Sequence, residues 1–124
     1  MSRTEKLRTF LESMEQKYHP SLRYHERAGR ALEYICDQKK FSDTAFAQVL
    51  TEAEFYYQNH AQQQELSEQA HEIVDKLQIE KDPQKKKEYV AELLETLNKS
   101  LQGINSTVER AARYVETMQQ KKMN

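Results

Sequence analysis

Glycine and proline are scarce in this sequence, and their scarcity limits the fold. A chain of 124 residues with average composition would hold about 9 glycines and about 6 prolines, whereas this chain has two of each. Tight turns depend on these residues, so turns are few and β-hairpins are nearly excluded. Charged residues make up 31 % and hydrophobic residues 37 %, which suits amphipathic helices better than a disordered tail. We therefore predict an all-α protein with a single domain over residues 1–124.

Long hydrophobic runs are also missing. No stretch approaches the roughly 18 apolar residues of a membrane span, and the N-terminal sequence MSRTEKLRTF has no apolar run that could act as a signal peptide. The single cysteine, Cys36, excludes an internal disulfide and fits a reducing compartment. The sequence thus predicts a cytoplasmic protein without a membrane span.

The motifs of common enzyme and cofactor sites are absent. There is no zinc ribbon, P-loop, GxGxxG turn or GxSxG elbow. Glu68 and His71 have the E-x-x-H spacing of di-iron bundles, but such a site needs a second E-x-x-H and two further glutamates from other helices. No second copy exists. We predict that the protein is not an enzyme and that it has no metal and no cofactor.

Apolar residues recur at alternating steps of three and four along the whole chain, which is the period of a helix face. The pattern is clearest in one coiled-coil-like seam near the C-terminus: Val90, Leu94, Leu97, Leu101, Ile104, Val108, Ala111, Val115 and Met118. Capping signals precede each helical region, at Ser2 with Glu5, at Ser42 or Asp43, and at Asp82-Pro83. Three arms of about 37 residues follow, at roughly 3–39, 43–79 and 83–119, each about 55 Å long.

Pro20 interrupts the first arm, because proline breaks or kinks a helix just upstream of itself. The apolar seam nevertheless continues in phase across it, so we predict one arm that is kinked or broken near Pro20. Equal arms with short connections favour an elongated antiparallel three-helix bundle. A four-helix bundle, with breaks at Pro20 and again near Gln62–Gln64, is the alternative.

Charge supports intrachain pairing of the arms. The net charge is +3 over residues 1–41, −7 over 42–82 and +3 over 83–124. An acidic middle helix between two basic helices favours this pairing over association of like with like, although each exposed pair contributes little.

One candidate face for binding another protein lies on the middle arm. Phe55, Leu66 and Ile73 form a stripe on the middle arm that lies off the main seam, and its exposure would allow a partner or a second copy to bind there. Burial against both neighbouring arms is the alternative, because amphipathic faces often exceed 100°.

A polar layer is predicted at the centre of the bundle. If the first two arms pair antiparallel, residues whose numbers sum to about 82 lie at one level, which puts His25 near Tyr57. His60 lies close to this level on the middle arm. Gly103 joins the layer from the third arm, whose matching level is rich in small residues. Buried polar layers often fix register, and a ligand pocket is the alternative.

The first arm also carries a basic stripe. Arg23, Arg27 and Arg30 share one face and Tyr34 follows on it, which is a weak signal for nucleic acid. Glu26 and Glu33 stand beside the stripe and the net charge of the chain is −1, so nucleic acid is disfavoured.

Helical bundles without catalytic motifs act mainly by presenting faces to other proteins. The sequence therefore predicts a small protein–protein interaction module, such as an adaptor, a chaperone-like protein or an inhibitory regulator, that forms a homodimer or binds another protein. A nucleic-acid-associated regulator that uses the basic stripe is the alternative.

Overall fold

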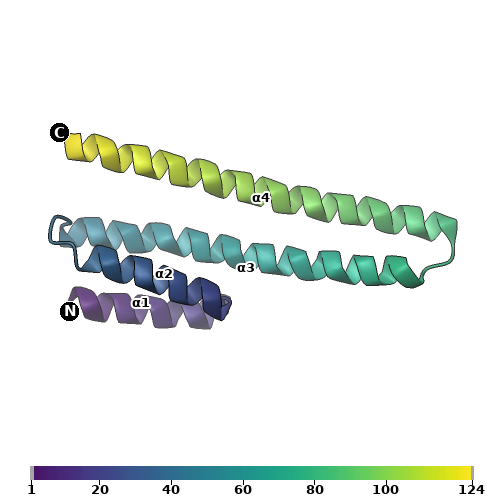
Figure 1. Cartoon of the computed structure of the whole chain (residues 1–124), viewed down its shortest axis with the longest axis horizontal. Coiled ribbons are helices and arrows are strands. Elements are labelled where there is room, and N and C mark those ends of the chain that lie inside the picture. The colour runs from purple at the N-terminus through teal and green to yellow at the C-terminus, as the bar shows by residue number, and fades with distance from the viewer. Residues whose placement is uncertain (1, 124) are drawn as a thin grey trace. The chain divides into compact units, whose positions relative to one another are not determined.

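The computed structural model describes residues 2–123, and the side chains of residues 2–120. In that part of the chain the structure is entirely helical, with no strand. The helices are α1 (Arg3–Tyr18), α2 (Leu22–Cys36), α3 (Asp43–Ile79) and α4 (Pro83–Met123) (Figure 1). The all-α prediction is confirmed. The three-helix count is wrong, because the first arm is two separate helices.

Each helix begins at a residue that caps its free backbone N–H groups. The Ser2 hydroxyl accepts from the Glu5 N–H at 3.2 Å, and the Ser42 hydroxyl accepts from the Ala45 N–H at 3.0 Å. Asp82 accepts from the Gln84 N–H at 3.2 Å with Pro83 in the first helical position. These caps confirm the predicted helix starts.

The turn at Pro20 separates α1 from α2. His19 ends α1 in the left-handed conformation, with φ 46° and ψ 54°, which reverses the chain as helix C-terminal turns commonly do. Pro20 cannot continue the helix, and the Ser21 hydroxyl then accepts from the Tyr24 N–H at 3.3 Å to start α2. Three consecutive residues therefore stop one helix and start the next. The shared phase across Pro20 reflects two amphipathic helices facing one core, and it does not indicate a continuous arm.

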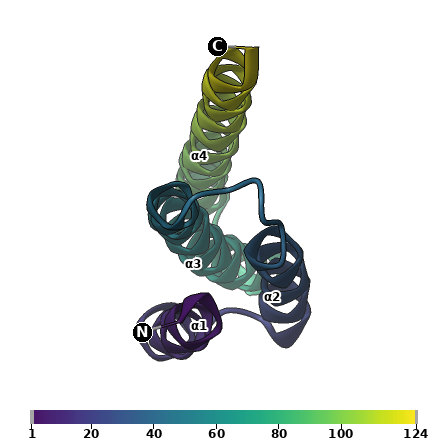
Figure 2. The same ribbon diagram turned by 90° about the vertical axis from the view of Figure 1, so that its left-hand side faces the viewer.

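The chain forms two compact units, Met1–Ala61 and Gln62–Asn124. The first contains α1, α2 and the beginning of α3, and the end-on view shows these three segments at the corners of a triangle (Figure 2). Its core consists of side chains that are at most 8 % exposed, contributed by all three segments: Leu7, Met14, Leu32, Phe46, Val49 and Tyr57. Helices with one apolar face are stabilised by burying that face in this way.

The register within the first unit matches the prediction for α2 and differs for α1. His25 lies against Tyr57, as the sum of 82 requires for antiparallel neighbours. Arg3, in contrast, lies beside Asp43, and Tyr18 beside Glu54, so α1 runs parallel to α3. The reason is the reversal at His19, which turns α1 back along α2.

The second unit is an antiparallel pair made of the later part of α3 and α4. The Gln63 amide donates to the Ser100 carbonyl at 3.0 Å, and the Ser100 hydroxyl donates to the Gln63 side-chain oxygen. Ile73, 8 % exposed, is the only hydrophobic side chain counted as buried among the described residues of this unit. Helix α3 passes through Gln62–Gln64 without interruption, so the break that the four-helix alternative predicted there is absent.

None of the helices in the described part of the chain has the length and apolar character needed to cross a membrane.

Candidate functional site

A cluster of aromatic and imidazole side chains lies in the first unit around Tyr57, which is 1 % exposed. The Tyr57 hydroxyl lies 2.8 Å from Nδ1 of His25. The Tyr24 and Phe10 rings meet the Tyr57 ring edge-on, with centroids 5.2 Å and 6.1 Å away. Nε2 of His25 lies 4.0 Å from a Glu15 carboxylate oxygen.

His60 forms the second half of the cluster. Its ring stacks on Tyr24 with centroids 4.0 Å apart and an angle of 5° between the planes, and its Nε2 lies 3.5 Å from the Ser21 hydroxyl. Ser21 also caps α2, so His60 contacts the first turn of that helix. The cluster therefore joins α2 to α3 at the end where α1 turns back.

Burial controls the protonation of these groups. It raises the pKa of Tyr57 to about 12, with a further contribution from Tyr24, and it raises the pKa of Tyr24. Burial also lowers the pKa of His60. All three shifts favour the neutral form. Tyr57 thus keeps its hydroxyl proton at neutral pH, and Tyr24 and His60 favour their neutral forms in the same cluster.

The structure brings together three of the four residues predicted for the polar layer. His25, Tyr57 and His60 lie in the first unit, whereas Gly103 belongs to the second, where it lines a groove of about 450 Å³ with Gln62 and Leu66. The role of this layer in fixing register stays a prediction. Tyr24 was missed by sequence reasoning, although it precedes His25 and its position on the α2 face could have indicated it.

Acidification is expected to destabilise the first unit through His60. Because the pKa of His60 is lowered in the folded chain, the unfolded chain binds more protons there once the pH falls below about 6.5. The free energy of unfolding should therefore fall as the pH drops through that value. Thermal melts at about pH 7.5 and about pH 5.5 measure the loss, and His60→Gln should lose less than the unchanged protein. Equal losses in the two proteins would contradict this role for His60.

The basic stripe lies on α2, and its four residues, Arg23, Arg27, Arg30 and Tyr34, are all exposed. Arg30 pairs with Glu26 at 3.7 Å, and an exposed pair of this kind contributes little to stability. Binding of nucleic acid by this stripe stays a prediction.

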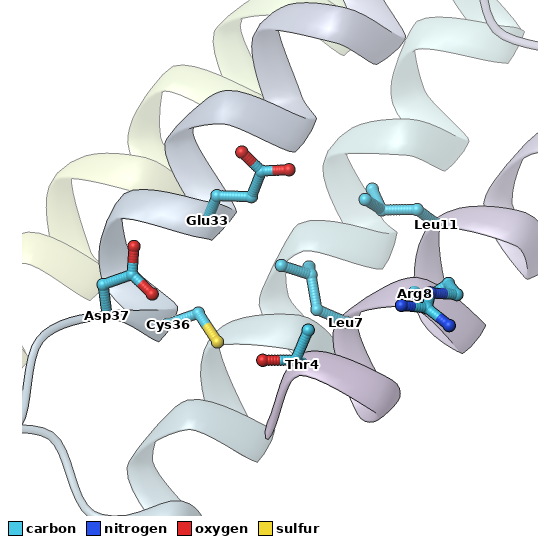
Figure 3. Close-up of a pocket in the computed structure, with 7 residues that line it drawn as sticks. All are labelled: Thr4, Leu7, Arg8, Leu11, Glu33, Cys36 and Asp37. Carbon is cyan, nitrogen blue, oxygen red and sulfur yellow. The ribbon is translucent and has the colours of Figure 1, made fainter. Parts of the chain in front are cut away.

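A groove of about 350 Å³ lies between α1 and α2, at the ends nearest the α2–α3 loop (Figure 3). The thiol of Cys36 points into it toward Leu7 and Thr4, while Arg8 lies on the α1 side and Glu33 on the α2 side (Figure 3). No histidine lines the groove, so Cys36 has no neighbouring imidazole base to activate it as a nucleophile.

The predicted stripe on α3 is not formed as one exposed surface. Phe55 is 43 % exposed, but Ile73 is only 8 % exposed and Leu66 is half-buried. Ile73 is buried because it lies on the face of α3 that is turned toward α4, as Gln63 does. The sequence had placed the next residue, Val74, on the apolar seam, but Val74 is 37 % exposed.

The most unusual surface of the second unit is the outer face of α4. Seven aliphatic side chains that follow one seam are each 42–62 % exposed: Val90, Leu94, Leu97, Leu101, Ile104, Val108 and Val115, here called the α4 stripe. They extend over about 38 Å of helix. The sequence identified this seam correctly but predicted that it would be buried.

The face of α4 that meets α3 carries small side chains near its middle, while Tyr89 and Leu93, which follow the same helical spacing, are half-buried as well. Thr96, Ser100 and Gly103 are half-buried, and the two hydrogen bonds between Ser100 and Gln63 hold the helices together at this level. Small residues let the two helices approach closely at the level of Ser100, and most of the larger aliphatic residues of α4 are left exposed. Periodicity alone could not distinguish the two faces, because both repeat every three and four residues.

Metal ligation finds no support in the part of the chain that the structure describes, where no group of three or more histidine, cysteine, aspartate or glutamate side chains could hold an ion. Nδ1 of His71 lies 2.7 Å from the Ser67 carbonyl of its own helix.

Comparison with known proteins yields no relative. No family model matches the chain, no curated protein matches it in sequence, and no solved structure matches it in fold. Function therefore has to be argued from the surfaces described above.

Proposed function

We propose that this protein is a protein–protein interaction module that acts through a helix face, in the manner of an adaptor, a chaperone-like protein or an inhibitory regulator. The observation that carries the proposal is the α4 stripe. Large contiguous apolar patches are rare on monomeric proteins, and they are typical of binding surfaces. A row of aliphatic side chains at heptad spacing is suited to packing against another helix.

The small number of buried hydrophobic side chains in the described part of the second unit supports this proposal. A helix is stabilised mainly by burial of its apolar face against another element. At the level of Gln63, helix α4 meets α3 through small and polar side chains. Leu93 is half-buried, but the seven aliphatic residues of the stripe stay exposed. A bound helix would supply the burial that these residues lack.

The test compares what the protein captures from an extract of its own host with what a stripe variant captures. Leu101→Glu places a charge in the stripe, and because Leu101 is 56 % exposed, the helical fold should survive. We expect the variant to lose the captured proteins. Ile79→Glu is the matched control, since Ile79 is 81 % exposed but lies outside the stripe. Unchanged capture by Leu101→Glu would contradict the proposal.

A further inference from the structure

We infer that the partner of the α4 stripe is a second copy of this chain, packed antiparallel about a two-fold axis near Gln102 and Gly103. This inference rests on the proposed function and specifies the occupant of the same surface. It follows from the match of the stripe to itself, from the uncharged residues beside it and from the distribution of charge along α4.

The stripe is complementary to its own reverse. With Leu101 of one copy opposite Ile104 of the other, each residue n lies opposite residue 205 − n. The resulting layers are Leu101 with Ile104, Leu97 with Val108, Leu94 with Ala111 and Val90 with Val115, each formed twice by symmetry. Every layer is aliphatic, and a two-fold interface requires this kind of self-matching surface.

On one side of the stripe, the neighbouring residues place no charge in this interface. The positions that follow Val90, Leu97, Ile104 and Ala111 are Ala91, Asn98, Asn105 and Ala112, all uncharged and all exposed. Charges at such flanking positions commonly select between partners in coiled coils. Their absence on this side removes like-charge repulsion between two identical helices.

More distant charges favour the antiparallel orientation. It places Glu92 level with Arg113 of the second copy and Glu95 level with Arg110, because each pair of numbers sums to 205. A parallel pair would instead set each residue beside its own like charge. Glu92 and Glu95 line a groove beside α3, and Glu95 pairs with Lys99 of its own helix. The charges therefore act at a distance, and they influence the orientation more than they strengthen the association.

The glutamates of α4 disfavour a membrane surface as the partner of the stripe. Helices that lie on anionic membranes carry lysine and arginine on the polar face. Residues 83–124 carry a net charge of +3, but Glu95, Glu109 and Glu116 each directly follow a stripe residue, which would set carboxylates near the lipid headgroups.

Sedimentation equilibrium of the purified full chain tests the assembly. We expect a mass of two 14.7 kDa chains for the unchanged protein and for the control Ile79→Glu. Leu101→Glu should raise the dissociation constant at least about tenfold, because it buries an unpaired charge in both central layers. Its circular dichroism should stay helical, since Leu101 is exposed in the single chain. A monomeric unchanged protein, or a Leu101→Glu variant that dimerises equally well, would overturn the inference.

Spin labels test the orientation. In a Cys36→Ser background, a label at Glu92→Cys should lie about 30 Å along the axis from its copy in an antiparallel dimer, whereas a label at Gln102→Cys should lie level with its copy along that axis. Short distances for both labels would show a parallel pair and overturn the arrangement. The two proposals fail separately: a monomer whose capture of host proteins still depends on Leu101 contradicts self-pairing and leaves the interaction function standing.

Discussion

Tyr57→Ala is expected to lower the free energy of unfolding by about 3–5 kcal/mol, the usual cost of truncating a buried aromatic side chain. Tyr57 is 1 % exposed and contacts the rings of Phe10, Tyr24 and His25. The loss is a large part of the total of about 5–15 kcal/mol that holds a typical domain folded. Urea denaturation followed by circular dichroism measures it.

Phe55→Ala is the matched control for Tyr57. Phe55 is an aromatic residue of the same helix, two positions away, but it is 43 % exposed, so its truncation should cost about 1 kcal/mol or less. Tyr57→Phe separates packing from hydrogen bonding, since it removes only the hydroxyl that lies against His25 and should cost about 1 kcal/mol. Equal losses for Phe55→Ala and Tyr57→Ala would show that this description of the α3 surface is wrong.

Arg3→Ala is expected to cost about 1.5–3 kcal/mol, the range for hydrogen bonds made by charged groups. The Arg3 guanidinium donates to the carbonyls of Cys36, Gln38 and Phe41 and to the Asp43 carboxylate. It also lies 5.9 Å from the centre of the Phe46 ring, which is fully buried. One side chain thus ties the start of α1 to the loop between α2 and α3.

Two further variants show which part of Arg3 matters. Arg3→Lys should recover little of the loss, because an ammonium group cannot reproduce the planar fork of five N–H donors. Arg8→Ala, an exposed arginine on the same helix, should change stability by no more than about 0.5 kcal/mol. The Asp43 pair contributes less than the carbonyl bonds, since Asp43 is 78 % exposed, although Arg3 does hold the pKa of Asp43 below its usual value. Full recovery by lysine would contradict the role of the fork.

The sequence predicted local structure well where a single residue decides it. The caps at Ser2 and Ser42 and the start at Asp82-Pro83 depend on hydrogen bonds within one turn, and all are present. The contact between His25 and Tyr57 followed from the short connection between two antiparallel helices. Such features require no knowledge of the rest of the chain.

The predictions failed where a choice depended on distant packing. Two helices facing one core keep the same apolar phase as one continuous helix, so the pattern around Pro20 could not decide between them. On α4, the larger aliphatic residues indicated the buried face, yet the smaller face with Ser100 meets α3. The period of a pattern identifies the faces of a helix, but the shape of the neighbour decides which face it contacts.

The division of the chain at residue 61 bears on the order of events during synthesis. All contacts of the first unit lie among its first 61 residues, and helical units with such local contacts fold in microseconds to milliseconds. A ribosome that adds about 5–20 residues per second needs about 3–13 seconds for residues 62–124. The first unit can therefore complete its core, with Tyr57 enclosed, before the synthesis of α4 has ended.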